Sequence, residues 1–121
     1  MSQRFQRGDI ILVRFPFTDL SGSKRRPGVV LAEFPPDIVV AFISSLIPNM
    51  LELSDVLLQP SSPYFSATGL KKESVIRLRK LATLEQTLVT RRLGKLNQGL
   101  IKDVDKALLN GLGIDVNHLE S

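Results

Sequence analysis

The apolar residues of this chain gather in short runs that are typical of β-strands. The runs are rich in β-branched residues and end at prolines, glycines or small polar residues, which favour turns. Strands are predicted in this way at residues 9–15, 28–34, 38–46, 55–59 and 74–81. The third run is apolar along nearly its whole length, which indicates a strand buried on both faces.

The fifth run alternates apolar and charged residues. Side chains along a strand point to opposite faces in turn, so Ile76 and Leu78 should face the core while Arg77 and Arg79 face outward. A half-exposed strand with a basic outer face is therefore predicted. Residues 82–96 are ambiguous, and their apolar spacing fits a strand end followed by a turn of helix.

Near the C-terminus the period of the apolar residues changes to that of a helix. Asn97 is a good N-cap, and Gly111 and Gly113 supply a stop signal. The apolar positions between them recur about every 3.6 residues: Leu100, Ile101, Val104, Ala107, Leu108 and Leu112. Several short strands and one terminal amphipathic helix predict a mainly β fold, a small and partly open barrel with the helix packed on its sheet.

Length and composition narrow the class of protein. The 121 residues suffice for one hydrophobic core, so a single domain spanning residues 1–121 is expected. Cysteine is absent, which excludes disulfides and a thiolate nucleophile. The polar N-terminus does not resemble a signal peptide, and no apolar run approaches the roughly 20 residues of a membrane helix. A cytoplasmic protein with no membrane association is predicted.

The positive charge is segregated along the chain. The formal net charge is +4, and residues 71–95 carry eight lysines and arginines against two glutamates. Residues 35–70 carry no basic residue at all. Such segregation is typical of a face that binds a polyanion, although an ordinary solvated basic surface fits the composition equally well.

Several kinds of chemistry have no support in the sequence. The only histidine, His118, lies close to the C-terminus, and no carboxylates cluster with the spacing of metal ligands. A Ser-His-Asp triad would need that same histidine, and no glycine-rich phosphate loop is present. Neither a metal nor a cofactor is predicted.

Arginines and hydroxyl groups remain as candidate functional groups. Arg25 and Arg26 stand where a turn-rich segment leads into a predicted strand, and Pro27 restricts Arg26 to extended backbone angles. Ser44 and Ser45 interrupt the third apolar run at its C-terminal end. Taken by position alone, solvated loop charges and strand-end caps explain these residues as well as a site does.

Longer motifs, taken in their order and spacing, resemble those of a known protein family. The chain reads "RGDIILVRFPFTD", "RRPGVVL", "VVAFISS", "TGLKKESVIRLRKLATLE" and "LVTRRLGKLNQGLIKDVDKALLNGLG" in that order. This set, spread over roughly residues 7–112, resembles the MazF/PemK family of toxin endoribonucleases from type II toxin–antitoxin systems. The resemblance implies an SH3-like barrel of the CcdB/PemK-like kind that works as a homodimer. It also implies sequence-specific cleavage of single-stranded RNA, often mRNA, and a cognate antitoxin that occupies the RNA groove.

The resemblance also assigns the reacting groups. The arginine before the proline of the "RP" motif falls on Arg26, and the family's strand-end threonine falls on Ser44, where serine keeps the hydroxyl but lacks the methyl. Both are predicted to be catalytic, in a metal-independent attack by the RNA 2′-OH on the adjacent phosphorus. Arg26 is expected to be the central electrostatic group and a candidate for proton transfer, and Ser44 to be a hydrogen-bond partner of the phosphate. The group that takes the 2′ proton is left open. Further RNA-binding residues are expected at Lys24, Arg25, Ser45, Arg77, Arg79 and Phe17. The competing hypothesis is a non-catalytic module of the same barrel, either a gyrase-poisoning toxin or a plain RNA-binding protein.

Overall fold

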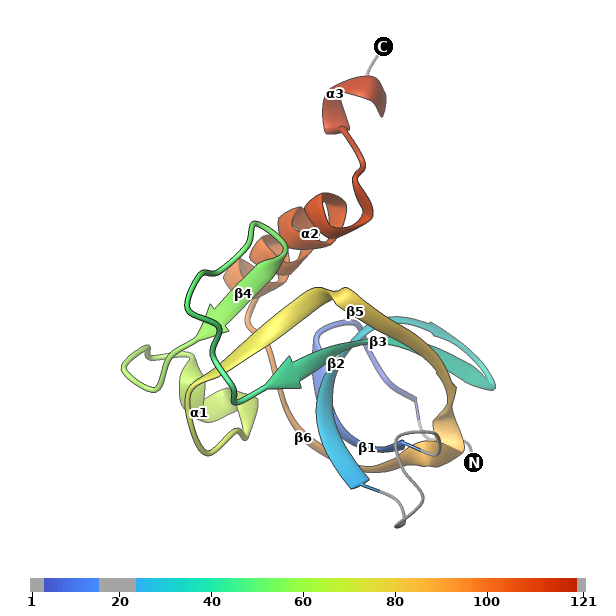
Figure 1. The fold of residues 1–121 in the computed structure, drawn as a ribbon. Coiled ribbons are helices and arrows are strands. Elements are labelled where there is room, and N and C mark those ends of the chain that lie inside the picture. Colours follow the sequence, from blue (N-terminus) through green and yellow to red (C-terminus); the bar gives the residue numbers. More distant parts are fainter. Residues whose placement is uncertain (1–3, 16–23, 120–121) are drawn as a thin grey trace.

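The computed structural model describes residues 4–15 and 24–119. In these residues it has six strands: β1 (Asp9–Phe15), β2 (Lys24–Phe34), β3 (Asp37–Ser44), β4 (Asp55–Leu58), β5 (Ser74–Glu85) and β6 (Val89–Lys95). Its helices are α1 (Phe65–Thr68), the 3-10 turn η1 (Gln86–Leu88), α2 (Gln98–Leu112) and α3 (Val116–Leu119). The strands form one antiparallel sheet in the order β4-β5-β3-β2-β1-β6, which curls into a small barrel (Figure 1).

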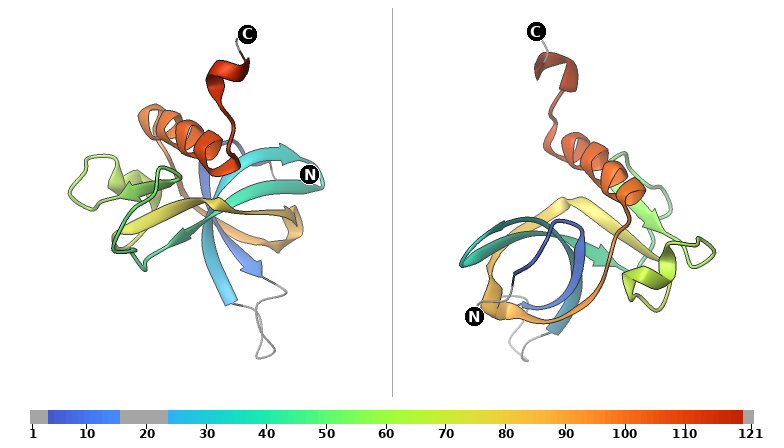
Figure 2. Two further views of the ribbon diagram at one scale, coloured as in Figure 1. Left: turned by 45° about the horizontal axis from the view of Figure 1, so that its top comes forward. Right: turned by 180° about the vertical axis from the view of Figure 1, so that it is seen from behind.

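The strands contribute alternate residues to two cores. One, the barrel core, lies inside the curled sheet and holds Phe5, Ile11, Val13, Val30, Ile38, Val40 and Leu84. The other, the helix-side core, includes Ile43, Ile76 and Leu78 together with Leu100 and Val104 of α2. Figure 2 shows α2 lying across the outside of the sheet, so each face of the sheet has its own apolar partner. The mainly β barrel with a C-terminal helix that the sequence predicts is confirmed.

Helix α2 follows its sequence pattern closely. The Asn97 side chain accepts a hydrogen bond of 2.9 Å from the backbone N–H of Leu100, and Gly113 ends the helix at a φ of 71°. Leu100, Val104 and Ala107 are its buried positions. The helix lies close to β5, because a Cβ on Gly111 would stand 2.7 Å from the backbone oxygen of Leu78. The predicted cap is present, and Gly113 is the stop, whereas Gly111 lies inside the helix. Leu112, predicted for the apolar face, is exposed.

The main differences from the sequence prediction lie at three places along the chain. Strand β2 begins at Lys24 rather than at residue 28, because residues 24–27 pair with β1 in the register that starts at Phe15 and Lys24. The ambiguous segment 82–96 contains the end of β5, η1 and the strand β6, which pairs with β1. Strand β3 ends at Ser44, two residues earlier than predicted. In the described part of the chain, no helix is both long and apolar enough to cross a membrane.

Candidate functional site

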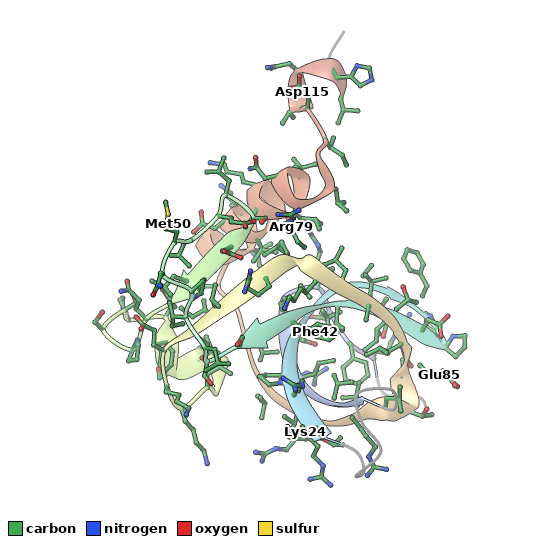
Figure 3. All side chains as sticks on the ribbon, viewed as in Figure 1. Lys24, Phe42, Met50, Arg79, Glu85 and Asp115 are labelled. Carbon is green, nitrogen blue, oxygen red and sulfur yellow. The ribbon has the colours of Figure 1, made fainter. Side chains whose placement is uncertain are left out.

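An open cleft of about 400 Å³ lies where β2 begins and β3 ends. The segment before β5 forms its third side. The lining residues are Lys24, Arg25, Arg26, Pro27, Ile43, Ser44, Ser45, Leu46, Leu70, Lys71, Lys72 and Ser74. Figure 3 shows Lys24 at the start of β2, on the side of the barrel away from α3. The structure therefore brings Arg26 and Ser44 to one cleft, together with Lys24, Arg25 and Ser45.

Strand register places Arg26 across from Ser44. The ladder between β2 and β3 pairs Val29 with Ala41 and Gly28 with Phe42. Two more steps in the same register lead to Arg26 and Ser44. Arg26 lies four residues before Val30, and Ser44 lies four residues after Val40. Because alternate residues of a strand point to the same face, Arg26 and Ser44 share the face of the sheet on which these two valines of the barrel core lie. Their backbone positions thus direct a guanidinium and a hydroxyl toward one space at the mouth of the barrel.

The proline and glycine after Arg26 shape this part of β2. Pro27 has no backbone N–H to donate to a neighbouring strand. Gly28 lies close to β3, because a Cβ at this position would be 3.2 Å from the backbone oxygen of Ala41. A side chain there would push the two strands apart just before the cleft. The "RPG" sequence therefore holds Arg26 at the end of a tightly packed strand pair.

The Ser44 hydroxyl is oriented by its own turn. Its oxygen accepts a hydrogen bond of 3.0 Å from the backbone N–H of Leu46. A serine hydroxyl accepts through its lone pairs and can still donate its proton elsewhere. Ser44 is half-buried and Ser45 is exposed. The geometry leaves the Ser44 proton available to a ligand in the cleft.

The cleft is strongly positive. Of its described lining residues, five are lysines or arginines and none is acidic. None of the five forms an ion pair with a carboxylate in residues 4–15 or 24–119, whereas five other arginines do: Arg4, Arg7, Arg77, Arg79 and Arg92. Guanidinium and ammonium groups held together without carboxylate partners attract an anion with several charges, such as a polynucleotide.

Sequence reasoning missed two cations of the cleft. Lys71 and Lys72 line it, although the sequence marks them only as part of a basic segment. The signal that places them is the pairing of Ser44 with Val75 at the start of β5, which brings the residues just before β5 beside the end of β3. The signal in the sequence was therefore a pair of adjacent lysines, separated by one glutamate from a strand predicted to be basic.

Two expected RNA-binding residues lie elsewhere. Arg77 donates a hydrogen bond of 2.8 Å from Nε to Asp55 on β4, and Arg79 donates one of 2.9 Å to Glu52. Neither arginine lines the cleft. The basic outer face predicted for this strand is in this part an ion-paired surface beside β4. Phe17 lies outside the described residues.

In the described residues, no three His, Asp or Glu side chains are grouped so that they could hold a metal ion. His118 lies in the short helix α3. The cleft's own donors are guanidinium, ammonium and hydroxyl groups, which bind anions directly rather than through a cation.

Comparison with known proteins identifies the family and agrees with the fold. The chain matches, over residues 6–112, the family described as PemK-like, MazF-like toxin of type II toxin–antitoxin system. The match covers most of the chain, so the protein belongs to the MazF/PemK family of toxins. The family that the sequence motifs resemble is thereby confirmed. No curated protein sequence matches the chain.

Solved structures share the fold at low sequence identity. A MazE–MazF structure (form II) from Deinococcus radiodurans has a TM-score of 0.72 at 16% identity, covering 94% of this chain and 100% of that chain. Mycobacterium tuberculosis toxin MazF-mt6 has a TM-score of 0.70 at 18% identity, covering 88% and 98% respectively. An endoribonuclease in complex with its cognate antitoxin from mycobacterial species has a TM-score of 0.71 at 14% identity, covering 93% and 98%. These likenesses establish that the barrel and helix are arranged as in MazF toxins.

Proposed function

We propose that this toxin is a sequence-specific endoribonuclease that cleaves single-stranded RNA, mRNA included. The observation that carries the proposal is that Arg26 and Ser44 line one cleft, together with four further cations and with no acidic residue among those described. Membership of the MazF/PemK family and a fold shared with a structure described as an endoribonuclease support it.

RNA supplies its own nucleophile for this reaction. The 2′-OH loses its proton as its oxygen attacks the adjacent phosphorus, the bond from phosphorus to the 5′-oxygen breaks, and the leaving 5′-oxygen takes up a proton. The products are a 2′,3′-cyclic phosphate and a 5′-OH. Negative charge grows on the nonbridging oxygens as the phosphorane forms. Arg26 presents a planar set of donors to these oxygens, and the Ser44 hydroxyl donates a hydrogen bond to the same phosphate. Preorganised donors of this kind stabilise the transition state without a metal ion.

The remaining cations bind the flanking RNA. Lys24, Arg25, Lys71 and Lys72 surround the two reacting residues and line the same cleft. Contacts from such groups to phosphates fix the register of a nucleic acid but do not read its sequence. We assign these residues to phosphates next to the scissile one, and Ser45 to hydrogen bonding within the cleft.

The partners that we propose for this protein follow in part from the same positive charge of the cleft. We propose that the whole chain is one toxin domain that works as a homodimer, and that a cognate antitoxin binds in the cleft through acidic side chains. Structures with the same fold are described as a complex with a cognate antitoxin and as MazE–MazF, which supports this assignment.

The test is a cleavage assay on a long single-stranded RNA in the presence of EDTA. The purified protein should cut at a short recurring sequence, and mapping of the ends should find a 2′,3′-cyclic phosphate or 3′-phosphate and a 5′-OH. Activity that EDTA abolishes and magnesium restores would contradict the proposed mechanism. An absence of cutting on any RNA would instead favour a toxin that acts by binding alone.

A further inference from the structure

A second group of arginines lies beside the cleft, on the outer face of the sheet. Arg14 of β1 pairs directly with Arg25 of β2. Arg91 of β6 pairs with Leu12, the residue two positions before Arg14 on the same face of β1. All three arginines are exposed. Three adjacent strands thus carry three arginines on one face, across about 10 Å at the usual spacing of strands.

This arrangement lowers the stability of the free protein. Like charges directly opposite each other on neighbouring strands repel, and a sheet normally places an opposite charge or a neutral residue there. No carboxylate among the described residues pairs with Arg14, Arg25 or Arg91, although Arg92, the next residue of β6, pairs with Asp9 at 3.0 Å. A row of like charges without counter-charges fits a surface that is neutralised by a bound polyanion.

The row is continuous with the proposed active site. Arg25 lines the cleft and also forms the cross-strand pair with Arg14. A strand of RNA held at Arg26 and Arg25 can therefore continue over β1 toward β6. Of the described aromatic residues, Phe5 lies in the barrel core and Phe65 and Tyr64 pack in the helix-side core, so these three rings are taken up by packing. Contact there would be with the phosphate backbone rather than with stacked bases.

We propose that Arg14 and Arg91 extend the RNA-binding site beyond the cleft, forming with Arg25 a track for the backbone of single-stranded RNA that flanks the cut. This proposal rests on the proposed nuclease function, because the track would bind another part of the same RNA substrate. It implies that long RNA binds more tightly than RNA that fills only the cleft. The recognition sequence would still be read inside the cleft, and the track would supply affinity without sequence preference.

The experiment measures binding and cleavage separately. Fluorescent oligouridylates of two lengths, one short enough to fill only the cleft and one extended at both ends, are titrated by anisotropy over a range of salt concentrations. The protein carries Arg26→Ala to prevent cleavage, with or without Arg14→Gln and Arg91→Gln. The matched control is Lys102→Gln with Lys106→Gln, which removes the same charge from exposed positions on α2.

The track variant should lose most of the affinity advantage of the long RNA over the short RNA. For the long RNA, the slope of log affinity against log salt should become shallower by about 1.4, since each phosphate contact to a single strand contributes roughly 0.7. The control variant should keep the advantage and the slope. Thermal melting should show the track variant to be at least as stable as its parent, because the Arg14–Arg25 repulsion is removed.

Two results would contradict the proposal of an RNA track. One is an unchanged length advantage in the track variant, and the other is an equal loss in the control. The proposed nuclease function is judged by a different measurement, which is cleavage by the protein with Arg26 intact. If that protein cuts no RNA while the track variant still loses the length advantage, the track stands and the nuclease proposal fails.

Discussion

At the scale of single residues, Arg25 and Arg26 differ in the face of the strand on which they lie. Arg26 belongs to the face that leads from the barrel core to Ser44, and Arg25 belongs to the outer face opposite Arg14. Adjacent residues of a strand cannot serve the same atom from opposite faces. The two guanidiniums should therefore have different roles, one at the scissile phosphate and one at a neighbour.

Substituting each arginine by alanine tests this division. Arg26→Ala should lower the cleavage rate at saturating RNA by at least about a hundredfold, as expected for the loss of one preorganised donor. Arg25→Ala should mainly raise the KM and flatten its salt dependence. Single-turnover kinetics over a range of RNA concentrations separates the two effects, and circular dichroism checks the fold. Equal losses in rate would show that the roles are not divided.

Ser44 offers a test that separates the hydroxyl from the methyl of the family residue. Ser44→Thr keeps the donor and adds the methyl, so we expect cleavage close to that of the unmodified protein. Ser44→Ala removes the donor and should lower the rate by roughly a hundredfold, by the same argument as for other transition-state donors. The comparison is made by initial rates on one RNA. If Ser44→Ala cleaves as fast as Ser44→Thr, the hydroxyl has no part in the reaction.

At the scale of elements, the ion pair between β4 and β5 holds the edge of the sheet. The Asp55 side chain is only 2% exposed, and its Oδ2 also accepts a hydrogen bond of 2.9 Å from the backbone N–H of Glu52. Its partner Arg77 is 26% exposed. The pair therefore anchors both β4 and the segment that leads into it, on the opposite side of β5 from β3.

Removing this carboxylate should destabilise the fold. We expect Asp55→Ala to lower the free energy of unfolding by about 2–3 kcal/mol, near the lower end for a broken buried pair because Arg77 retains some solvent access. Glu52→Ala is the matched control, since the Glu52–Arg79 pair is exposed and should contribute less than about 1 kcal/mol. Urea denaturation of both variants gives the comparison. Similar losses for the two would mean that Asp55 does not anchor the edge.

The same scale shows what the sequence could and could not predict. Apolar periodicity located β1, β3, β4 and α2 to within a few residues, because each of these elements buries its own apolar side chains. It missed the first residues of β2, since Lys24, Arg25 and Arg26 are exposed and are held in the strand only by pairing with β1. It also left β6 undecided, because β6 is an edge strand without fully buried residues.

The residues of the candidate site also divide into those that the sequence predicted and those that it did not. Arg26 and Ser44 were found through motif order, and the structure brings them to one cleft. Lys71 and Lys72 were missed because their position depends on the pairing of β3 with β5, which lies outside any local pattern. Arg77 and Arg79 were expected at the RNA because alternation marks them as outward-facing, but alternation does not show that Asp55 and Glu52 lie beside them.

At the scale of the whole molecule, the cleft is the place where RNA and antitoxin should compete. It is lined by five cations, and lysine and arginine side chains can pair with carboxylates as well as with phosphates. An acidic antitoxin segment, disordered when free and ordered on binding, should therefore exclude RNA without any change of conformation in the toxin. Its affinity should fall as salt is raised.

A displacement titration measures this competition. Labelled RNA bound to the Arg26→Ala variant should be released fully when purified cognate antitoxin is added, and the midpoint should move to higher antitoxin concentration at higher salt. A ternary complex with RNA and antitoxin on the same toxin at full occupancy would show that the two do not share the cleft. The same RNA-bound variant without antitoxin, measured at each salt concentration, serves as the reference.

Strand β5 also has a consequence for how the protein unfolds. Its Ile76 and Leu78 belong to the helix-side core, whereas Leu84 of the same strand belongs to the barrel core. Strand β3 is shared in the same way, with Ile43 in one core and Val40 in the other. Because β3 and β5 take part in both cores, displacing them to open one core also disrupts the packing of the other. Both cores should therefore unfold in a single cooperative step. Amide hydrogen exchange at Val104 in α2 and at Val13 in β1 should then report the same opening free energy, despite their positions in separate cores.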